Sequence, residues 1–264
     1  MLELKNITKI FNADTVNEKV ALDDLSLTLN DGDFVTVIGG NGAGKSTMLN
    51  AIAGTFPIDE GHVIIDGTDI TRLPEHKRAK FIGRVFQDPM TGTAGDMWIE
   101  ENMSLALNRG KVRGFGWAIQ ESERKEFKKM LARLDLGLEE RLSTKVGLLS
   151  GGQRQAITLL MATMNSPKLL LLDEHTAALD PKTAAMVLSI TRELVAEHKL
   201  TTLMITHNMQ DAIDNGNRLI MMQAGKIILD ISGEEKKNLT VDSLLEAFRK
   251  TSGSAFASDR ALLS

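Results

Sequence analysis

A glycine-rich segment, Gly39 to Ser46, constrains the fold of this chain more than any other feature of its sequence. It reads GGNGAGKS and matches the pattern G-x-x-x-x-G-K-[ST]. A short apolar run, Phe34 to Ile38, precedes it and predicts a strand buried on both faces. A predicted helix follows, from about Ser46 to Ala53, and Gly54 is expected to end it. This strand–loop–helix arrangement is typical of a phosphate-binding loop.

The residue types in this loop suit phosphate for physical reasons. Glycines let backbone N–H groups approach phosphate oxygens without side-chain clashes, and the helix N-terminus adds partial positive charge. Lys45 is expected to neutralise β- and γ-phosphates, and Ser46 to offer its hydroxyl to Mg²⁺. A structural glycine-rich turn is the alternative, but a chance match in this chain is on the order of one in a hundred. The residues predicted to bind the phosphates are Gly39, Asn41, Gly42, Ala43, Gly44, Lys45, Ser46 and Thr47.

A second candidate element, Leu169 to Glu174, reads LLLLDE, an apolar strand that ends in two carboxylates. In a parallel sheet, ligands bind at the C-terminal ends of the strands. Asp173 is suited to hold Mg²⁺ through water, while Glu174 is suited to polarise an attacking water as general base. Acidic strand ends are usually only solvated, but downstream of a phosphate loop we predict these metal-binding and catalytic roles.

A third element, Leu149 to Gln153, reads LSGGQ. Ser150 followed three residues later by Gln153 has the form of a capping box. The helix predicted from about Gly151 to Met164 would then present a hydroxyl, glycine N–H groups and a positive dipole end, a second anion site. Ser150, Gly151, Gly152 and Gln153 are therefore candidate nucleotide-binding residues, with an ordinary helix cap as the alternative.

Strand and helix signals alternate along much of the chain, which predicts an α/β fold with a mostly parallel sheet covered on both faces. Asp180-Pro181 predicts the start of a helix, with Asp as N-cap and Pro at the first helical position. Further strands are predicted at Leu25 to Leu29, His62 to Asp66, Leu169 to Asp173, Leu203 to Thr206 and Leu219 to Met222. A last short helix is predicted from Val241 to Lys250.

The region from about Pro89 to Asn165 has a helical pattern instead. Its clearest helix carries apolar residues at i, i+3, i+4 and i+7, and Gly137 is expected to end it. These apolar residues are Phe127, Met130, Leu131 and Leu134.

Composition excludes several classes of protein. A net charge of −4 gives no general attraction to nucleic acid, so no nucleic-acid partner is expected. The absence of cysteine excludes disulfides and thiolate metal sites. No signal peptide is expected from the N-terminal residues. The longest apolar runs fall far below the ~20 residues that span a bilayer, so we expect any membrane part on another chain.

A phosphate loop, then LSGGQ, then an apolar strand ending in Asp-Glu, in that order, resembles the nucleotide-binding subunit of ABC transporters. The resemblance covers about Leu2 to Ile231. It implies a P-loop NTPase core with a mostly parallel sheet, an N-terminal antiparallel β subdomain and an inserted helical lobe. On this basis residues 1–250 form one ABC ATPase domain, with the lobe at about 89–165 in its RecA-like core, and residues 251–264 form a flexible tail.

The resemblance assigns further site residues. Gln87 matches the glutamine that reaches Mg²⁺ and the attacking water, so we expect both catalytic and metal-binding roles for it. Asp180 matches the loop that crosses the dimer interface, and His207 matches the histidine that contacts the γ-phosphate. Phe11 lies where the family places an aromatic ring on adenine, although this residue fits a core position as well. His175 departs from the family, which usually has proline there, and a neutral substitution is the simpler interpretation.

The resemblance also implies partners and cofactors. Two such subunits, identical or close paralogues, pack head to tail and enclose two ATP with Mg²⁺ between the loop of one and LSGGQ of the other. The lobe meets polytopic membrane permease subunits, so we expect a cytoplasmic protein bound to the inner face of the membrane. Four apolar residues of the lobe suit either a groove for a partner helix or its core: Met90, Met97, Trp98 and Met103. The basic loop Arg109 to Gly116 suits lipid headgroups, the partner or solvent.

Two function classes stay open: the ATPase subunit of a transporter, and a soluble ABC ATPase in a role such as cofactor assembly. The short spacing between the phosphate loop and LSGGQ, without heptads, disfavours chromosome-organising and repair members. A free-standing subunit resembles bacterial importers, some of which work with an extracellular substrate-binding protein. Residues Thr91 to Arg113 look similar to a group associated with amino-acid uptake.

Overall fold

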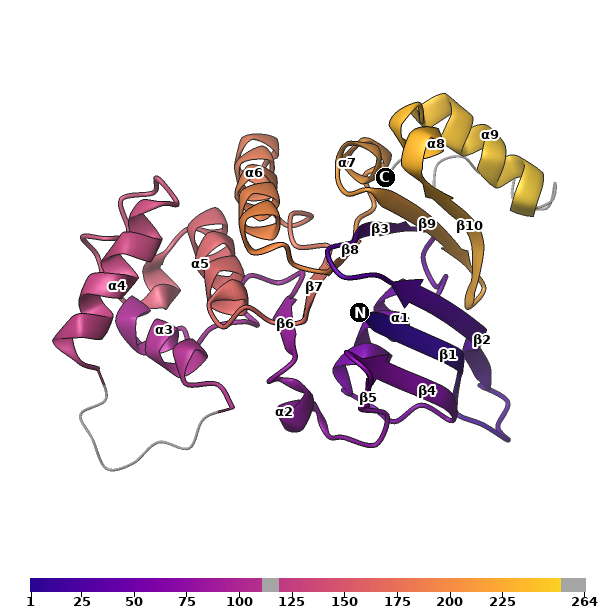
Figure 1. The fold of residues 1–264 in the computed structure, drawn as a ribbon, viewed down its shortest axis with the longest axis horizontal. Coiled ribbons are helices and arrows are strands. Elements are labelled where there is room, and N and C mark those ends of the chain that lie inside the picture. The colour runs from indigo at the N-terminus through magenta and orange to yellow at the C-terminus, as the bar shows by residue number, and fades with distance from the viewer. Residues whose placement is uncertain (111–118, 253–264) are drawn as a thin grey trace.

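The computed structural model describes residues 1–110 and 119–252, which build two sheets with helices between and around them (Figure 1). Within these ranges, no helix has the length and apolar character needed to cross a membrane. Most of the predicted basic loop and most of the predicted tail lie outside the described residues, so the structure tests neither.

The first sheet is antiparallel and has the strand order β2-β1-β4-β5. Its strands are β1 (Leu2–Phe11), β2 (Lys19–Leu29), β4 (Glu60–Ile65) and β5 (Thr68–Asp69). The predicted strand at His62 to Asp66 is β4 and starts two residues earlier. Its predicted last residue, Asp66, instead has a left-handed φ of 52° in the turn to β5.

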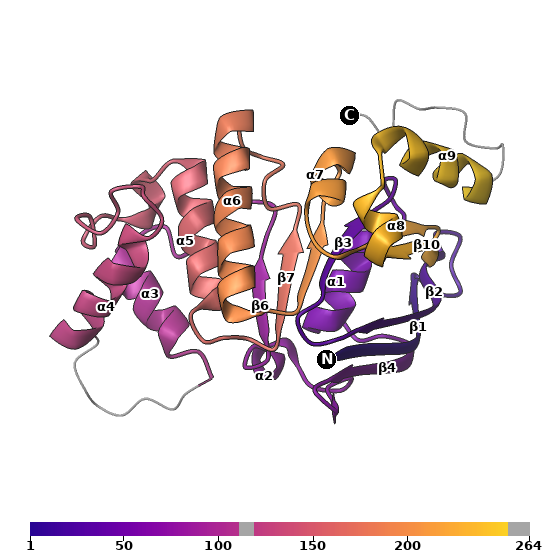
Figure 2. The ribbon, with the colours of Figure 1, turned by 45° about the horizontal axis from the view of Figure 1, so that its top comes forward.

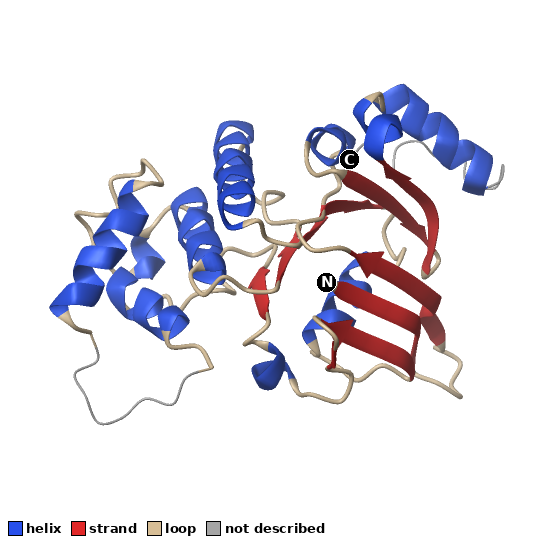
Figure 3. Ribbon diagram, in the orientation of Figure 1, coloured by secondary structure: helices blue, strands red, loops and turns tan. Residues whose placement is uncertain are grey.

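The second sheet has the strand order β10-β9-β3-β8-β7-β6, parallel throughout except for β10. Its strands are β3 (Phe34–Ile38), β6 (Ile82–Val85), β7 (Leu169–Asp173), β8 (Thr202–Ile205), β9 (Arg218–Gln223) and β10 (Lys226–Ser232). Together the two sheets confirm the predicted α/β fold, with a mostly parallel sheet and an N-terminal antiparallel one (Figure 3).

The helices are α1 (Lys45–Ala53), α2 (Glu75–Arg78), α3 (Ile99–Leu107), α4 (Glu121–Ala132), α5 (Gly151–Thr163), α6 (Pro181–His198), α7 (Met209–Asp214), α8 (Gly233–Lys237) and α9 (Val241–Ser252). A 3₁₀ turn, η1 (Val146–Leu148), precedes α5. Helices α5 and α6 run side by side against the parallel sheet, and α1 lies between the two sheets (Figure 2).

Strand β7 shows how its sequence places it between these layers. Leu169 and Leu171 pack in the core that contains α1 and the antiparallel sheet, whereas Leu170 and Leu172 pack in the core that contains α5 and α6. Successive side chains of a strand point to opposite faces, so a run of four leucines is what a strand covered on both faces requires. The run ends at Asp173, where the strand reaches a partly exposed edge.

Helix α4 ends earlier than the sequence predicts, at Ala132 rather than near Gly137. Asp135 has a left-handed φ of 53°, a conformation that no helix can continue through. Leu134 lies beyond the helix and is still buried in the same core as Phe127 and Leu131. The apolar period therefore identified buried residues correctly but overestimated the length of the helix.

A buried lysine, Lys236, closes the end of α7. Its Nζ donates hydrogen bonds to the carbonyl oxygens of Ala212 at 2.9 Å, Ile213 at 2.7 Å and Asn215 at 2.9 Å. Burial lowers the pKa of Lys236, and the charge of Asp214 opposes that shift. An ammonium at a helix C-terminus satisfies carbonyls that have no helical partner.

We therefore expect Lys236→Met to lower the free energy of unfolding by about 2–4 kcal/mol, because it removes a charged donor from three carbonyls, of which that of Ala212 keeps a hydrogen bond from the Thr36 hydroxyl. Lys237→Met is the matched control, since Lys237 is exposed and pairs with Glu234 on the same helix. Urea unfolding of the two variants measures the difference. Equal stabilities would contradict the role given to Lys236.

Candidate active site

The predicted phosphate loop connects β3 to α1, and two of its positions require glycine. Gly44 has a φ of 102°, and a Cβ on it would lie 2.6 Å from the carbonyl oxygen of Ala21. Gly39 has a φ of 151°, and a Cβ on it would lie 2.3 Å from the carbonyl oxygen of Met222. Any larger residue at either position would displace backbone, so these glycines allow the loop to close over the N-terminus of α1.

Lys45 is the first residue of α1 and is buried beneath the loop. Its Nζ donates to the carbonyl oxygens of Gly39 at 2.6 Å and Gly40 at 3.2 Å. Burial lowers the pKa of Lys45, while the carboxylates of Glu174 and Asp173 oppose this shift. Lys45 thus places a positive charge at the base of the loop, hydrogen-bonded to two neutral carbonyls, which fits an anionic ligand above it.

The carboxylate of Asp173 ends β7 beside the start of α1. Ser46 donates its hydroxyl to Asp173 Oδ1 at 3.3 Å, and Arg84 Nη2 lies 3.9 Å from Asp173 Oδ2. Burial raises the pKa of Asp173, and the charge of Arg84 is the largest influence that lowers it. Within the described residues, no three His, Cys, Asp or Glu side chains gather as a metal site. One carboxylate and one hydroxyl fit Mg²⁺, which commonly takes few protein ligands and completes its shell with phosphate oxygens and water.

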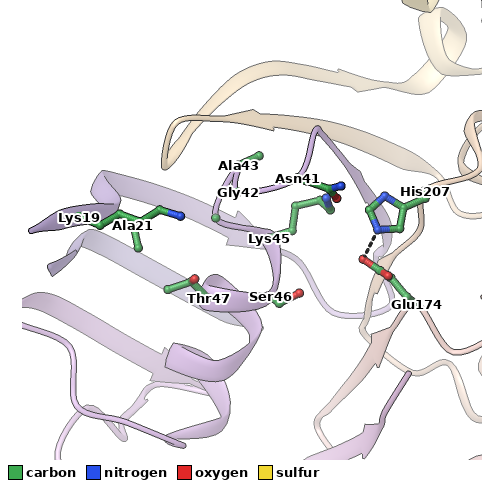
Figure 4. Close-up of a pocket in the computed structure, with 11 residues that line it drawn as sticks. Lys19, Ala21, Asn41, Gly42, Ala43, Lys45, Ser46, Thr47, Glu174 and His207 are labelled. Carbon is green, nitrogen blue, oxygen red and sulfur yellow. Dashed lines mark ion pairs between the residues drawn. The ribbon is translucent and has the colours of Figure 1, made fainter. Parts of the chain in front are cut away.

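Glu174 and His207 face each other across the ends of β7 and β8 (Figure 4). The distance from His207 Nε2 to Glu174 Oε1 is 2.6 Å, and the Glu174 side chain is only 9% exposed. Glu174 has a φ of 47°, a left-handed conformation that costs a non-glycine residue on the order of 1 kcal/mol. Its N–H donates to the carbonyl of Ile205 at 3.1 Å, which ties this turn to β8.

The loop, Lys45 and this pair surround a cavity of about 160 Å³. Its lining consists of Lys19, Ala21, Asn41, Gly42, Ala43, Gly44, Lys45, Ser46, Thr47, Glu174 and His207. Sequence reasoning identified all of these except Lys19 and Ala21, which come from β2. No local motif marks those two residues, because only the position of β2 beside the loop brings them to the cavity.

The other predicted site residues lie outside this lining. Gln87 is exposed just after β6, and Asp180 caps α6 by accepting the N–H of Thr183 at 3.1 Å. Ser150 Oγ accepts the N–H of Gln153 at 3.3 Å, while Gln153 Oε1 accepts the N–H of Ser150 at 3.2 Å. The predicted capping box is therefore confirmed. Gly151 and Gly152 form the first turn of α5.

Phe11 is partly buried at the end of β1. Its ring packs edge-to-face on Phe56, with centroids 5.3 Å apart and an interplanar angle of 81°. Lys9 Nζ lies 5.4 Å from the centroid of the Phe11 ring. Phe11 thus has packing partners within the chain and retains exposed surface, so the adenine-stacking role stays a prediction.

The four apolar residues noted in the lobe separate into two kinds. Met103 is fully buried among lobe residues, so a core role is correct for it. Met90 and Trp98 are 59% and 43% exposed, and Met97 is partly buried. In the basic loop, Arg109 Nη2 donates to the carbonyl of Ala162 at 3.4 Å, while residues 111–118 lie outside the described residues.

Comparison with known proteins decides the family. The model of the ABC transporter family matches residues 22–177, a segment that includes the phosphate loop, LSGGQ and the Asp-Glu strand end. The chain belongs to the ABC transporter ATPase family. It is 45% identical over 248 residues to the tyrosine transport ATP-binding protein of Clostridioides difficile, covering 94% of this chain and 98% of that relative.

Other ABC relatives are longer than this chain. The spermidine/putrescine import ATP-binding protein PotA of Haemophilus ducreyi is 36% identical over 91% of this chain, which spans 62% of that relative. The methionine import ATP-binding protein MetN of Corynebacterium efficiens is 34% identical over 86% of this chain, which spans 61% of that relative.

Solved ABC cassettes share the fold. A dimeric ATP-binding cassette in a post-hydrolysis state, bound to ADP and Pi, matches with a TM-score of 0.75 and 32% identity over 88% of this chain and 98% of that one. A nucleotide-free ABC transporter cassette matches with a TM-score of 0.76 and 30% identity over 93% of this chain and 95% of that one. These matches confirm the recognised family and fold, and the chain is an ABC-type ATP hydrolase.

His175, which replaces the proline usual in ABC ATPases, is buried behind Glu174. Its Nε2 lies 3.0 Å from Thr191 Oγ1 on α6, and that hydroxyl donates to the carbonyl of Val187 at 2.8 Å. The imidazole is therefore the donor to Thr191, and it is neutral. Burial lowers the pKa of His175 from 6.5 to about 4.

This burial predicts acid sensitivity. Between pH 6.5 and pH 4 the unfolded chain binds a proton at His175 that the folded chain does not, so stability falls as pH falls through that window. The loss amounts to about 3 kcal/mol. We expect His175→Leu to flatten the pH dependence of urea unfolding between pH 7 and pH 4.5. His198→Gln, at an exposed histidine, is the control and should keep the parent's dependence of stability on pH. The same pH dependence in the parent and both variants would contradict the prediction.

Proposed function

We propose that the chain is the ATP-hydrolysing subunit of a membrane transporter, in which two copies, or this chain and a close paralogue, enclose two ATP–Mg²⁺. Hydrolysis in this dimer drives transport through separate polytopic permease chains. The protein would then act on the cytoplasmic side, bound to the inner face of the membrane through those chains.

One observation is the main support for the proposed dimer. The N-terminus of α5, with Ser150 and Gly151 exposed, has a hydroxyl, glycine N–H groups in its first turn and the helix dipole, which together suit an anion. Yet neither residue lines the cavity at the phosphate loop in the described part of the chain. A second copy packed head to tail brings its own α5 to that cavity. The similarity to a dimeric cassette bound to ADP and Pi supports this arrangement.

The chemistry assigned to the cavity follows from the side chains present. Glu174 would orient the attacking water and accept its proton, and His207, 2.6 Å away, would hold that carboxylate and contact the terminal phosphate. Lys45 would neutralise phosphate charge from beneath the loop. Ser46 and Asp173 would hold Mg²⁺, with Gln87 joining from outside the cavity. When bound, this ion would neutralise charge on the β- and γ-phosphates.

The direction and cargo are proposed from the relatives. The relative with 45% identity is named for tyrosine transport, and two others are named as import proteins for spermidine/putrescine and methionine. We infer solute import, with an amino acid as the cargo and an extracellular substrate-binding protein as the delivery partner. The transported molecule would contact the permease rather than this subunit.

Affinity purification of the tagged chain from detergent-solubilised membranes tests the proposal. We expect a polytopic membrane protein in a defined ratio to the ATPase, retained when Glu174→Gln is the bait. Loss of the membrane protein from a bait with a charged residue at exposed Met90 would locate the contact. Recovery of only soluble partners would favour the alternative role in cofactor assembly.

A further inference from the structure

We propose that Lys19, on β2, is a nucleotide-binding residue that contacts the α-phosphate, the phosphate nearest the adenine base. This inference rests on the proposed binding of ATP at the phosphate loop. Lys19 is the first residue of β2 and lines the cavity together with Gly42 and Lys45. Its side chain extends toward Gly42 (Figure 4). The Nζ atom lies 3.7 Å from where a Cβ on Gly42 would be.

The strand register places Lys19 between the two ends of a bound nucleotide. Lys19 is the cross-strand partner of Phe11 in the antiparallel pair of β1 and β2. Side chains of directly opposite residues lie on the same face of a sheet, about 5 Å apart at Cβ. The Lys19 side chain therefore extends from beside Phe11, whose ring is proposed to stack on adenine, to the tip of the phosphate loop. If a nucleotide stacks its adenine on Phe11 and places its terminal phosphate near Glu174, its α-phosphate lies beside Lys19.

The charge of Lys19 is available for such a contact. Lys19 is exposed, and no ion pair of its ammonium is recorded among residues 1–110 and 119–252. Acidic neighbours have other partners: Glu18 accepts the N–H of Asp14 at 2.9 Å, and Asp23 pairs with Lys226 at 3.0 Å. An ammonium that faces a glycine-rich phosphate loop without a carboxylate partner is suited to bind a phosphate oxygen.

Lys19 and Lys45 differ in the part of the ligand they can reach. Lys45 is buried under the loop and directed at Gly39 and Gly40, on the side of Glu174 and Asp173. Lys19 approaches from β2, on the side of Gly42 and Phe11. The two ammonium groups thus flank the loop, and we assign the γ-phosphate side to Lys45 and the α-phosphate side to Lys19.

Nucleotide titration of Lys19→Met tests this assignment. We expect its dissociation constants for ATP and ADP to rise by the same factor, about five- to tenfold, because both nucleotides carry the α-phosphate. Lys19→Arg, which keeps a cation, should recover most of the affinity. Lys5→Met is the matched control, since Lys5 is an exposed lysine on the neighbouring strand β1, pairs with Glu3 of its own strand and should leave binding unchanged.

Each outcome has a distinct meaning. A loss for ATP but not for ADP would overturn the assignment to the α-phosphate, and no loss for either nucleotide would remove Lys19 from the binding site. A melting temperature of Lys19→Met equal to that of the parent would show that the loss is not one of folding. A parent chain that binds no ATP would overturn the proposed function itself, together with this inference.

Discussion

Glu174→Gln is expected to lower the rate of ATP hydrolysis by at least about a hundredfold while ATP binding is retained. Glutamine has nearly the shape of glutamate, but it cannot accept a proton from the attacking water. The substitution also replaces the carboxylate oxygen that lies 2.6 Å from His207 Nε2 with an atom of a neutral amide. Steady-state phosphate release measures the rate, and equilibrium titration measures the affinity.

A second readout of the same variant is its assembly state. Because ATP is bound but not cleaved, we expect Glu174→Gln to accumulate as an ATP-bound dimer in size-exclusion chromatography. Glu193→Gln, an exposed carboxylate on α6, is the control and should behave as the parent does. Hydrolysis by Glu174→Gln at the parental rate would show that Glu174 is not the general base.

Lys45→Ala is expected to weaken ATP binding by about a hundredfold, since a charge-assisted contact to a polyphosphate is lost. The loss should be larger for ATP than for AMP, because Lys45 is assigned to the β- and γ-phosphates. Nucleotide titration measures both. Lys80→Ala, at an exposed lysine, is the control. Unchanged ATP affinity in Lys45→Ala would contradict the phosphate-loop assignment.

Much of this fold is readable from sequence because its signals are local. The leucines of β7, the Asp180-Pro181 start of α6 and the capping box at Ser150 each depend on residues a few positions apart. Predictions were less accurate where a backbone conformation decides the end of an element. The left-handed residues Asp66, directly after β4, and Asp135, shortly beyond α4, prevent these elements from continuing at places that the apolar pattern does not mark.

The site residues likewise fall into those that local sequence motifs identify and those that only the fold brings to the cavity. Local motifs identify the cavity residues from Asn41 to Thr47, together with Glu174 and His207. Lys19 has no motif, and it reaches the cavity only through the pairing of β2 with β1 and the closeness of β2 to the loop. The roles proposed for Ser150 and Gln87 cannot be read from this cavity, because neither residue lines it in the described part of the chain.

A mixing experiment tests most directly whether one nucleotide needs two chains. Lys45→Ala disables the phosphate loop, and Ser150→Arg blocks the exposed end of α5, so neither homodimer has an intact site. A mixed dimer, however, joins the intact loop of one chain to the intact Ser150 of the other. We predict that the mixture hydrolyses ATP at up to about a quarter of the parental rate, because half of randomly formed dimers carry one complete site of two. A mixture no more active than the two variants measured separately would contradict the shared site.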